Sequence, residues 1–388
     1  MKDTNHNNNH DSHSQTGRRI RVAIIGTQGV PAQYGGFETL VENLIGEHCS
    51  ADIDYTVICS SADLPGRMER YKNARLKYIG VPANGAKSLL YDAISLWMVR
   101  KGFDVILYLG AAVPVLKSYK RMAKTPMIIN IDGLSQLRDK YGKWQKKYLA
   151  YIKNNEILRA DLIVADNEGI REYVSDNYGL PSELIAYGGD QALMEMSPAD
   201  ERAILEAYGV EPGEYGIAVC RIEPENNPEM VLEAYARSGR KLVYIGNWEK
   251  SEYGRELRRR YSGYTNLNLH DPEYDLKTLS ALRGNAGMYI HGHSVGGTNP
   301  SLVEAMFFGR PIAAFDVNYN RYTTFGSASY FTDADSLRKL ISQPADAAQG
   351  EALKRLAYEH YTWRHIVDLY EQAYRRMVGA PKAKGGKR

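Results

Sequence analysis

Short apolar runs alternate with longer segments of helical period along most of this 388-residue chain. In the first half, the runs with the length of strands cover residues 21–26, 55–59, 105–109, 127–131 and 162–165. Between them, the spacing of apolar residues predicts one helix that begins at Phe37 and another near Ser88 to Arg100. Strands that alternate with helices are typical of a parallel, doubly wound sheet.

The same pattern restarts after Pro198, where a helix begins, and a further helix is predicted from Asn227. The strands predicted in this half cover residues 216–220, 242–245, 267–270, 288–291 and 312–315. The segment from Tyr187 to Pro198 is rich in Gly, Asp and Met without periodicity, as in a hinge placed over a cleft. The predicted α/β organisation is a disordered tail (1–17), two Rossmann-like domains (18–190 and 191–365), and a final helix with a basic tail (366–388).

Composition and length agree with two soluble domains. The chain is longer than a single core usually grows, and 44% of its residues are hydrophobic. Its apolar runs stay far below the roughly 20 residues of a membrane-spanning helix, and the segment Met1–Gly17 has no apolar signal region. We therefore expect a cytoplasmic protein. Its three cysteines show no metal-ligand spacing and are predicted to be reduced thiols.

The ends of the first two predicted strands of the N-terminal domain bear on the cofactor. A dinucleotide-binding domain would carry G-x-G-x-x-G after its first strand and an acidic residue at the end of the second. The chain reads Gly26-Thr-Gln-Gly29 at the first position and Cys59-Ser60-Ser61 at the second. A nicotinamide dehydrogenase is therefore not favoured.

The stretch Tyr289–Met306 reads YIHGHSVGGTNPSLVEAM and predicts a strand, a glycine-rich turn and a helix. Asn299 is the expected N-cap and Pro300 the first helical residue. Such a helix start can bind anions, because its backbone N–H groups have no partner within the helix. The alternative is that the Asn-Pro pair only caps the helix.

Several residues of this stretch are candidate ligands for a nucleotide. Gly296 and Gly297 let the backbone approach a ligand closely, and the N–H groups from Gly297 through Thr298 to Asn299 can receive phosphate or sugar oxygens. Glu304, one turn inside the helix, can accept hydrogen bonds from ribose hydroxyls. The alternative for Glu304 is a favourable interaction with the helix dipole.

Four strings together resemble a known family. They are GTQGVPAQYGGFETLVENL from Gly26, IINIDGL from Ile128, RIEPENNPEMVLEAY from Arg221 and HGHSVGGTNPSLVEAM from His291. They are similar to retaining GT-B glycosyltransferases of family four, and most of all to rhamnosyltransferases of bacterial capsule and cell-wall polysaccharide assembly. The resemblance extends from about Arg19 to about Arg376 and implies two Rossmann-like domains that face each other across a cleft.

The resemblance implies a donor site in the C-terminal domain. Arg221 matches the arginine that neutralises the donor diphosphate, but Asn226 stands near the position where the family usually has a lysine. The first of two family glutamates is replaced by Gly296, which leaves the sugar hydroxyls to backbone amides and to His291 or His293. Glu304 matches the second glutamate.

In the N-terminal domain, Gly35 and Gly36 match a glycine pair that approaches the donor phosphates, and Glu38 follows at the helix start. Asp132 follows a predicted strand, and ligand sites of such sheets lie at the carboxyl ends of strands. Asp132 is therefore the candidate for acceptor positioning or proton acceptance, with a turn aspartate as the alternative. The implied reaction retains the anomeric configuration, and the leaving diphosphate acts as the local base.

No metal or other cofactor is expected. His291 and His293 lack the further ligands of a zinc set, and the run Asp271, Glu273, Asp275 is only superficially similar to a metal site.

The expected donor is dTDP-rhamnose, and the expected acceptor is a lipid-linked saccharide in surface polysaccharide synthesis. The alternatives are a sugar-nucleotide epimerase and an inactive sugar-nucleotide-binding subunit.

Residues 137–153 read LRDKYGKWQKKYLAYIK and place five apolar or aromatic residues on one helical stripe flanked by basic residues. Trp and Tyr favour the headgroup region of a bilayer, and Lys and Arg favour an anionic leaflet. This segment is predicted to hold the N-terminal domain against the inner membrane face. Gly142 interrupts the helix, and the alternative is an ordinary amphipathic helix packed on the sheet. The small net charge of +3 does not point to nucleic acid.

Overall fold

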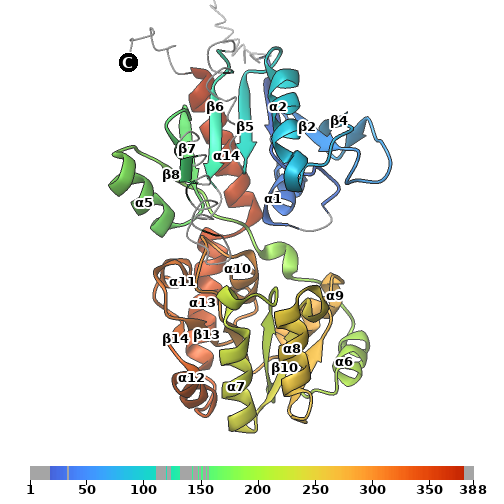
Figure 1. The fold of residues 1–388 in the computed structure, drawn as a ribbon, viewed down its shortest axis with the longest axis vertical. Helices are drawn as coiled ribbons and strands as arrows, with labels where there is room; N and C mark the ends of the chain where they lie inside the picture. The colour runs from blue at the N-terminus through green and yellow to red at the C-terminus, as the bar shows by residue number, and fades with distance from the viewer. Residues whose placement is uncertain are drawn as a thin grey trace, which may run out of the picture.

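Two sheets, one in each half of the chain, form the framework of the protein (Figure 1). The computed structural model describes residues 18–32, 35–110, 119, 124–131, 142, 147, 150–151, 154 and 157–379. The N-terminal domain lies at the top of the view and the C-terminal domain below it. The predicted α/β class with two parallel-sheet domains is confirmed.

The N-terminal sheet has the strand order β3-β4-β2-β1-β5-β6-β7-β8 and is parallel except for the β3–β4 pair. Its strands are β1 (Ile20–Ile25), β2 (Ile53–Ser60), β3 (Arg70–Tyr71), β4 (Ala74–Ile79), β5 (Val105–Leu109), β6 (Met127–Ile131), β7 (Leu162–Ala165) and β8 (Glu183–Leu184). The helices of this half are α1 (Gly36–Leu44), η1 (Gly85–Lys87), α2 (Ser88–Val99) and α5 (Glu168–Tyr178). Its central strands are fully buried because parallel sheets carry helices on both faces.

The C-terminal sheet has the order β11-β10-β9-β12-β13-β14. Its strands are β9 (Tyr215–Val219), β10 (Lys241–Ile245), β11 (Leu267–His270), β12 (Met288–His291), β13 (Ile312–Phe315) and β14 (Ser329–Phe331). The helices of this half are η3 (Asp190–Ala192), α6 (Pro198–Ala207), η4 (Pro224–Asn226), α7 (Pro228–Ser238), η5 (Trp248–Lys250), α8 (Glu252–Tyr261), α9 (Leu276–Gly284), α10 (Pro300–Met306), α11 (Asn318–Thr323), α12 (Ala334–Ile341), α13 (Ala347–His360) and α14 (Trp363–Gly379). All strand pairs of this sheet are parallel.

The last helix leaves the C-terminal domain and packs on the N-terminal sheet, where Figure 1 shows it in red. Trp363, Tyr370 and Tyr374 are buried in the same core cluster as residues of β1 and β5. The Tyr370 hydroxyl accepts a hydrogen bond of 2.7 Å from the side chain of Asn130 at the end of β6. The chain therefore connects its two domains twice, once through the hinge after β8 and once before α14.

Each sheet reverses its strand order at one point. In the N-terminal sheet the reversal lies between β1 and β5, and in the C-terminal sheet between β9 and β12. Open α/β sheets bind ligands in the crevice at the carboxyl ends of the strands that flank this reversal. In the part of the chain that the structure describes, no helix combines the length and apolar character needed to cross a membrane.

Candidate functional site

The loops that follow β9 and β12 lie against each other at the reversal point of the C-terminal sheet. Ser294 donates a backbone hydrogen bond of 2.9 Å to the carbonyl of Glu225, and the Asn227 side chain donates one of 2.9 Å to the carbonyl of Gly292. A Cβ atom placed on Gly292 would lie 2.3 Å from the carbonyl oxygen of Asn226, so only glycine permits this approach. Two segments far apart in the sequence thus form one continuous rim at the carboxyl ends of β9 and β12.

Arg221 projects from the first of these loops. Its side chain is 36% exposed, and its guanidinium lies 3.3 Å from the carboxylate of Glu223. Asn226 is 1% exposed, and its side chain donates a hydrogen bond of 2.7 Å to the Arg221 carbonyl. Asn226 therefore holds the backbone that carries Arg221, and Arg221 supplies a positive charge at the rim.

His291 and His293 extend from the end of β12 with their rings stacked, the centroids 4.3 Å apart. His291 is 1% exposed, and among the described residues neither of its ring nitrogens has a hydrogen-bond partner. Burial and the neighbouring His293 hold the pKa of His291 well below its ordinary value. His291 is therefore a neutral imidazole, which can donate one hydrogen bond and accept another from a ligand.

The glycine turn before α10 meets the N-terminal domain. Gly296 has φ +141°, a backbone conformation that favours glycine, and the space next to it is open. Thr298 donates its backbone N–H to a carboxylate oxygen of Asp166 at 3.0 Å, and Asp166 directly follows β7. The sequence predicted that the amides of this turn would face a ligand, but the Thr298 amide faces a carboxylate of the other domain. Nothing in the local pattern around Asp166 indicated this contact.

The predicted start of α10 is confirmed. The Asn299 side chain accepts hydrogen bonds from the Ser301 backbone N–H at 3.0 Å and from the Ser301 hydroxyl at 2.8 Å. Pro300 is the first helical residue, where its missing N–H costs no helical hydrogen bond.

The start of α1 faces the start of α10 across the two domains. A Cβ atom placed on Gly36 would lie 3.8 Å from the Pro300 ring and 3.7 Å from the Tyr187 ring. Gly35 has φ +130°, and a Cβ atom there would lie 2.1 Å from the carboxylate of Glu38. The glycine pair predicted for the N-terminal domain and the turn predicted for the C-terminal domain therefore converge.

Glu38 supports this loop of the N-terminal domain. Its carboxylate accepts a hydrogen bond of 3.1 Å from the backbone N–H of Gln28 in the loop after β1. Burial raises the pKa of Glu38, since it disfavours the charged form. Its position agrees with a role in shaping the loop.

Glu304 is held by two partners that the sequence did not reveal. One carboxylate oxygen lies 2.8 Å from the guanidinium of Arg283 in α9, and the other accepts a hydrogen bond of 2.8 Å from the Gln191 side chain in the hinge. Arg283 is almost fully buried. An arginine among the apolar residues Leu279 and Leu282 was the available signal, since buried charges require a partner.

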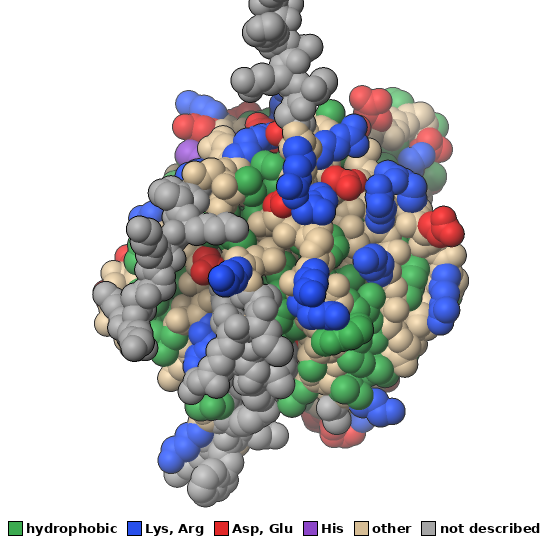
Figure 2. Space-filling model, turned by 90° about the horizontal axis from the view of Figure 1, so that it is seen from above, with side chains coloured by type: hydrophobic (Ala, Val, Ile, Leu, Met, Phe, Trp, Pro, Cys, Tyr) green, Lys and Arg blue, Asp and Glu red, His purple; other side chains and the backbone are tan. Residues whose placement is uncertain are grey.

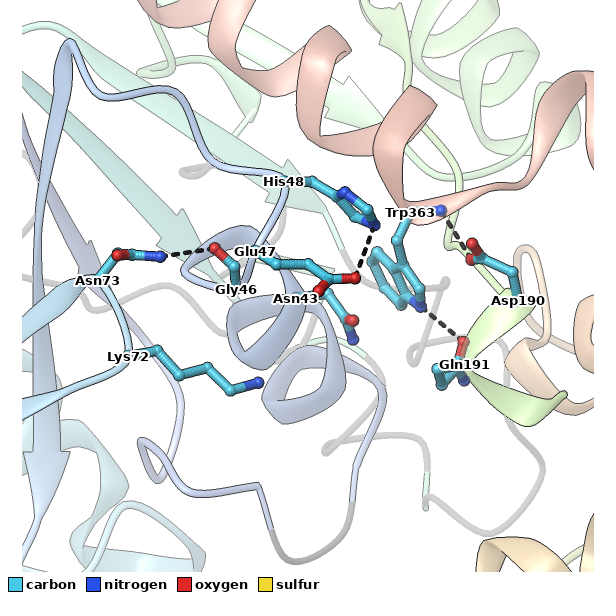
Figure 3. Close-up of a pocket in the computed structure, with 9 residues that line it drawn as sticks. All are labelled: Asn43, Gly46, Glu47, His48, Lys72, Asn73, Asp190, Gln191 and Trp363. Atoms are coloured by element: carbon cyan, nitrogen blue, oxygen red, sulfur yellow. Dashed lines mark hydrogen bonds and ion pairs between the residues drawn. The ribbon is translucent and has the colours of Figure 1, made fainter. Parts of the chain in front are cut away.

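A hollow of about 550 Å³ lies beside the hinge (Figure 3). It is lined by Asn43, Gly46, Glu47, His48, Lys72, Asn73, Asp190, Gln191 and Trp363. The indole N–H of Trp363 donates a hydrogen bond of 2.6 Å to the Gln191 side chain, whose other end reaches Glu304. The hollow is therefore linked through one amide to the predicted nucleotide site.

Two predictions fall wholly or largely outside the described residues. Asp132 is one, although β6 ends at Ile131, immediately before it. The segment 137–153 is the other, and only four of its positions are described: Gly142, Lys147, Ala150 and Tyr151. The catalytic role of Asp132 and the membrane role of this segment remain predictions.

The acidic run after β11 has local structural roles. Asp271 pairs with Arg258 at 2.7 Å, and Asp275 caps α9 by accepting the N–H of Thr278 at 2.9 Å. Glu273 accepts a hydrogen bond of 3.2 Å from the Tyr208 hydroxyl. Across the described parts of the chain, no group of three or more His, Cys, Asp or Glu residues is arranged to hold a metal ion. The cysteines Cys49, Cys59 and Cys220 are free thiols, as predicted.

A family model described as a domain of unknown function (DUF1972) matches residues 19–190. No curated protein sequence matches the chain.

Solved structures match it over nearly its whole length. A sucrose-phosphate synthase from Thermosynechococcus elongatus has a TM-score of 0.74 at 16% identity and covers 94% of this chain and 100% of its own. A trehalose 6-phosphate synthase from Burkholderia multivorans has a TM-score of 0.70 at 12% identity, over 96% of this chain and 100% of its own. The Anabaena protein HepE in complex with UDP-glucose has a TM-score of 0.66 at 13% identity, over 92% and 99%. With two parallel-sheet domains arranged as in these proteins, the chain has the GT-B fold.

Proposed function

We propose that this protein is a glycosyltransferase that moves a sugar from a sugar nucleotide to an acceptor. The observation that carries the proposal is the convergence of three predicted elements at the reversal points of two sheets: the Arg221 loop, the turn before α10 and the glycine pair before α1. HepE, which has the same fold, is described in complex with UDP-glucose. A shared fold alone does not assign an activity, so the site residues carry the argument.

The donor binds in the C-terminal domain in this proposal. Arg221 neutralises the charge that develops on the leaving diphosphate, which is an electrostatic form of catalysis. His291 offers neutral ring nitrogens to sugar or phosphate oxygens, and His293 extends this surface. Glu304 can accept a ribose hydroxyl while it keeps Arg283 and Gln191, because a carboxylate has about four acceptor positions.

The proposed reaction is transfer with retention. The acceptor hydroxyl attacks from the face that the diphosphate leaves, and the departing phosphate takes up its proton. Asp132 positions the acceptor. This mechanism needs neither the paired carboxylates of a retaining glycosidase nor a divalent ion, since Arg221 and backbone N–H groups stabilise the leaving group.

The proposed donor is dTDP-L-rhamnose, and the proposed acceptor is a lipid-linked saccharide of bacterial surface polysaccharide. Support comes from the string HGHSVGGTNPS, which resembles the rhamnosyltransferase subgroup, and from the aromatic and basic composition of residues 137–153. Lys and Arg side chains are also spread over the end of the N-terminal domain that points away from the C-terminal domain (Figure 2). Positive charge on this domain favours contact with an anionic membrane surface.

A thermal-shift panel of sugar nucleotides tests the donor. A ligand at 100 times its dissociation constant adds roughly 2.7 kcal/mol of apparent stability, so dTDP-rhamnose should shift the unfolding temperature more than UDP-glucose or GDP-mannose. Incubation with donor alone then separates the alternatives. An epimerase converts the sugar without an acceptor, whereas an inactive binding subunit gives a shift but neither hydrolysis nor transfer.

Turnover in excess chelator tests the proposed absence of a catalytic metal. We expect activity to persist. Complete loss of activity that only a divalent metal restores would contradict the proposed mechanism.

A further inference from the structure

The carboxylate of Asp166 reaches from the N-terminal domain into the glycine turn of the C-terminal domain. Asp166 is 4% exposed, and its carboxylate accepts the Thr298 backbone N–H at 3.0 Å. Its backbone carbonyl also accepts a hydrogen bond from the Thr298 hydroxyl. The contact therefore links the two domains at the turn in which the sequence predicts anion binding.

Gly297 makes room for this carboxylate. A Cβ atom placed on Gly297 would lie 2.3 Å from one carboxylate oxygen of Asp166 and 2.4 Å from the other. The space that a glycine opens beside a helix start was expected to admit a ligand. In this structure, the side chain of Asp166 fills that space.

The neighbouring residue extends the contact into a surface. The side-chain amide of Asn167 lies 3.2 Å from the Thr298 hydroxyl, and its other hydrogen-bond acceptors belong to α11. The Asn167 oxygen meanwhile caps α5 through the N–H of Gly169 at 2.9 Å. The connection from β7 to α5 is thus hydrogen-bonded to the glycine turn before α10, which we call the donor turn. These hydrogen bonds must break if the two domains separate.

We propose that Asp166 is a gating residue that occupies the donor turn until a sugar nucleotide displaces it. This inference rests on the proposed function. The Thr298 N–H carries one hydrogen, which cannot serve the Asp166 carboxylate and a donor oxygen at full strength. A diphosphate is anionic, and it would be repelled by the carboxylate of Asp166, which is buried beside Thr298. The donor therefore gains the Thr298 amide when Asp166 leaves, and donor binding is linked to a change in the contact between the domains.

The gate lowers the apparent affinity for the donor. When only a fraction of the free protein is competent to bind, the apparent dissociation constant rises by the inverse of that fraction. A gate that is closed in about nine of ten free molecules weakens binding about tenfold. Removal of the carboxylate should therefore tighten nucleotide binding by about tenfold, which equals about 1.4 kcal/mol.

Calorimetric titration of Asp166→Ala and Asp166→Asn with dTDP and UDP tests the gate. We expect about tenfold tighter binding by Asp166→Ala and a smaller gain by Asp166→Asn, whose amide oxygen can still accept from Thr298. Asp176→Asn is the matched control, because Asp176 is an exposed acid on α5, the helix that follows the Asp166 connection. Small-angle scattering without nucleotide should show a larger radius of gyration for Asp166→Ala than for the wild type.

The possible results separate the gate from the proposed function. Unchanged or weaker nucleotide binding by folded Asp166→Ala, with binding by the wild type intact, overturns the gate and leaves the glycosyltransferase assignment standing. Binding that appears only in the Asp166 variants supports both. A failure of wild type and all variants to bind either nucleotide overturns the proposed nucleotide site, and the gate with it.

Discussion

The guanidinium of Arg283 lies 2.8 Å from the carboxylate of Glu304, and only 3% of the Arg283 side chain is exposed. The second carboxylate oxygen accepts a hydrogen bond from Gln191, which itself accepts the indole N–H of Trp363. Glu304 thus ties α9 and α10 to the hinge and to the helix that returns to the N-terminal domain. Glu304 therefore has a structural role in addition to its proposed contact with the ribose.

Replacement of Glu304 by Ala should therefore lower stability as well as donor use. The change leaves a buried guanidinium without its partner, and loss of one member of a buried pair costs roughly 3–5 kcal/mol. Urea denaturation measures the change in the free energy of unfolding. Glu252→Ala on α8, whose side chain is 86% exposed, is the matched control and should stay within about 0.5 kcal/mol of the wild type. An unchanged stability of Glu304→Ala would show that the Arg283 pair contributes nothing.

Replacement of Arg221 by Ala should impair turnover without a comparable loss of stability, because the side chain is partly exposed. Removal of one preorganised electrostatic group typically lowers the rate by about 10²-fold or more. The measurement is kcat/KM with saturating acceptor. Arg255→Ala, a half-exposed arginine on α8, is the control. Wild-type turnover in Arg221→Ala would refute the assignment of Arg221 to the diphosphate.

His291 should make the protein less stable in acid. Its pKa is held well below the ordinary value by burial and by His293, whereas in the unfolded chain a histidine titrates near about 6.5. Below that pH the unfolded state binds a proton that the folded state does not, so stability falls as the pH falls. His291→Phe should flatten this slope between about pH 7 and pH 5 and should weaken donor binding. Urea midpoints across this range measure the effect, and an unchanged slope would contradict it.

Gly297→Ala should be destabilising only while Asp166 is present. Gly297 does not have a left-handed backbone conformation, so the cost of alanine comes from the Cβ atom that would lie 2.3 Å from the Asp166 carboxylate. In the Asp166→Ala background that space is free. A double-mutant cycle by thermal unfolding should give a coupling of roughly 0.5–3 kcal/mol. Gly263→Ala, with open space at its Cβ position, is the matched control. Additive effects would mean that the two residues are not coupled.

The segment 137–153 should attach the protein to anionic vesicles. Its lysines favour an anionic leaflet, and salt screens such attraction over a Debye length of about 10 Å at 0.1 M. We expect co-sedimentation with phosphatidylglycerol vesicles that falls at high salt and in a variant with Lys143, Lys146 and Lys147 replaced by Gln. Circular dichroism should show an intact fold. If the wild type does not sediment with these vesicles at low salt, the membrane role is wrong and the acceptor is soluble.

The sequence determined the elements that local pattern controls. Continuous apolar runs marked strands such as Val105–Leu109 because both faces of a central parallel strand are buried. Asn299 and Pro300 marked the start of α10 because capping depends on a few consecutive residues. The strand Ala74–Ile79 was missed, since its residues alternate between buried and exposed near the sheet edge and form no continuous apolar run.

Which groups meet across the chain depends on long-range packing. Nothing local shows that Trp363 begins a helix that packs on the first domain, that Arg283 pairs with Glu304, or that Asp166 fills the space beside Gly297. A carboxylate after a strand has the same local pattern whether its partner is water, a ligand or an amide 132 positions away. The sequence therefore determines where the candidate site is built, and long-range packing decides what occupies it when no nucleotide is bound.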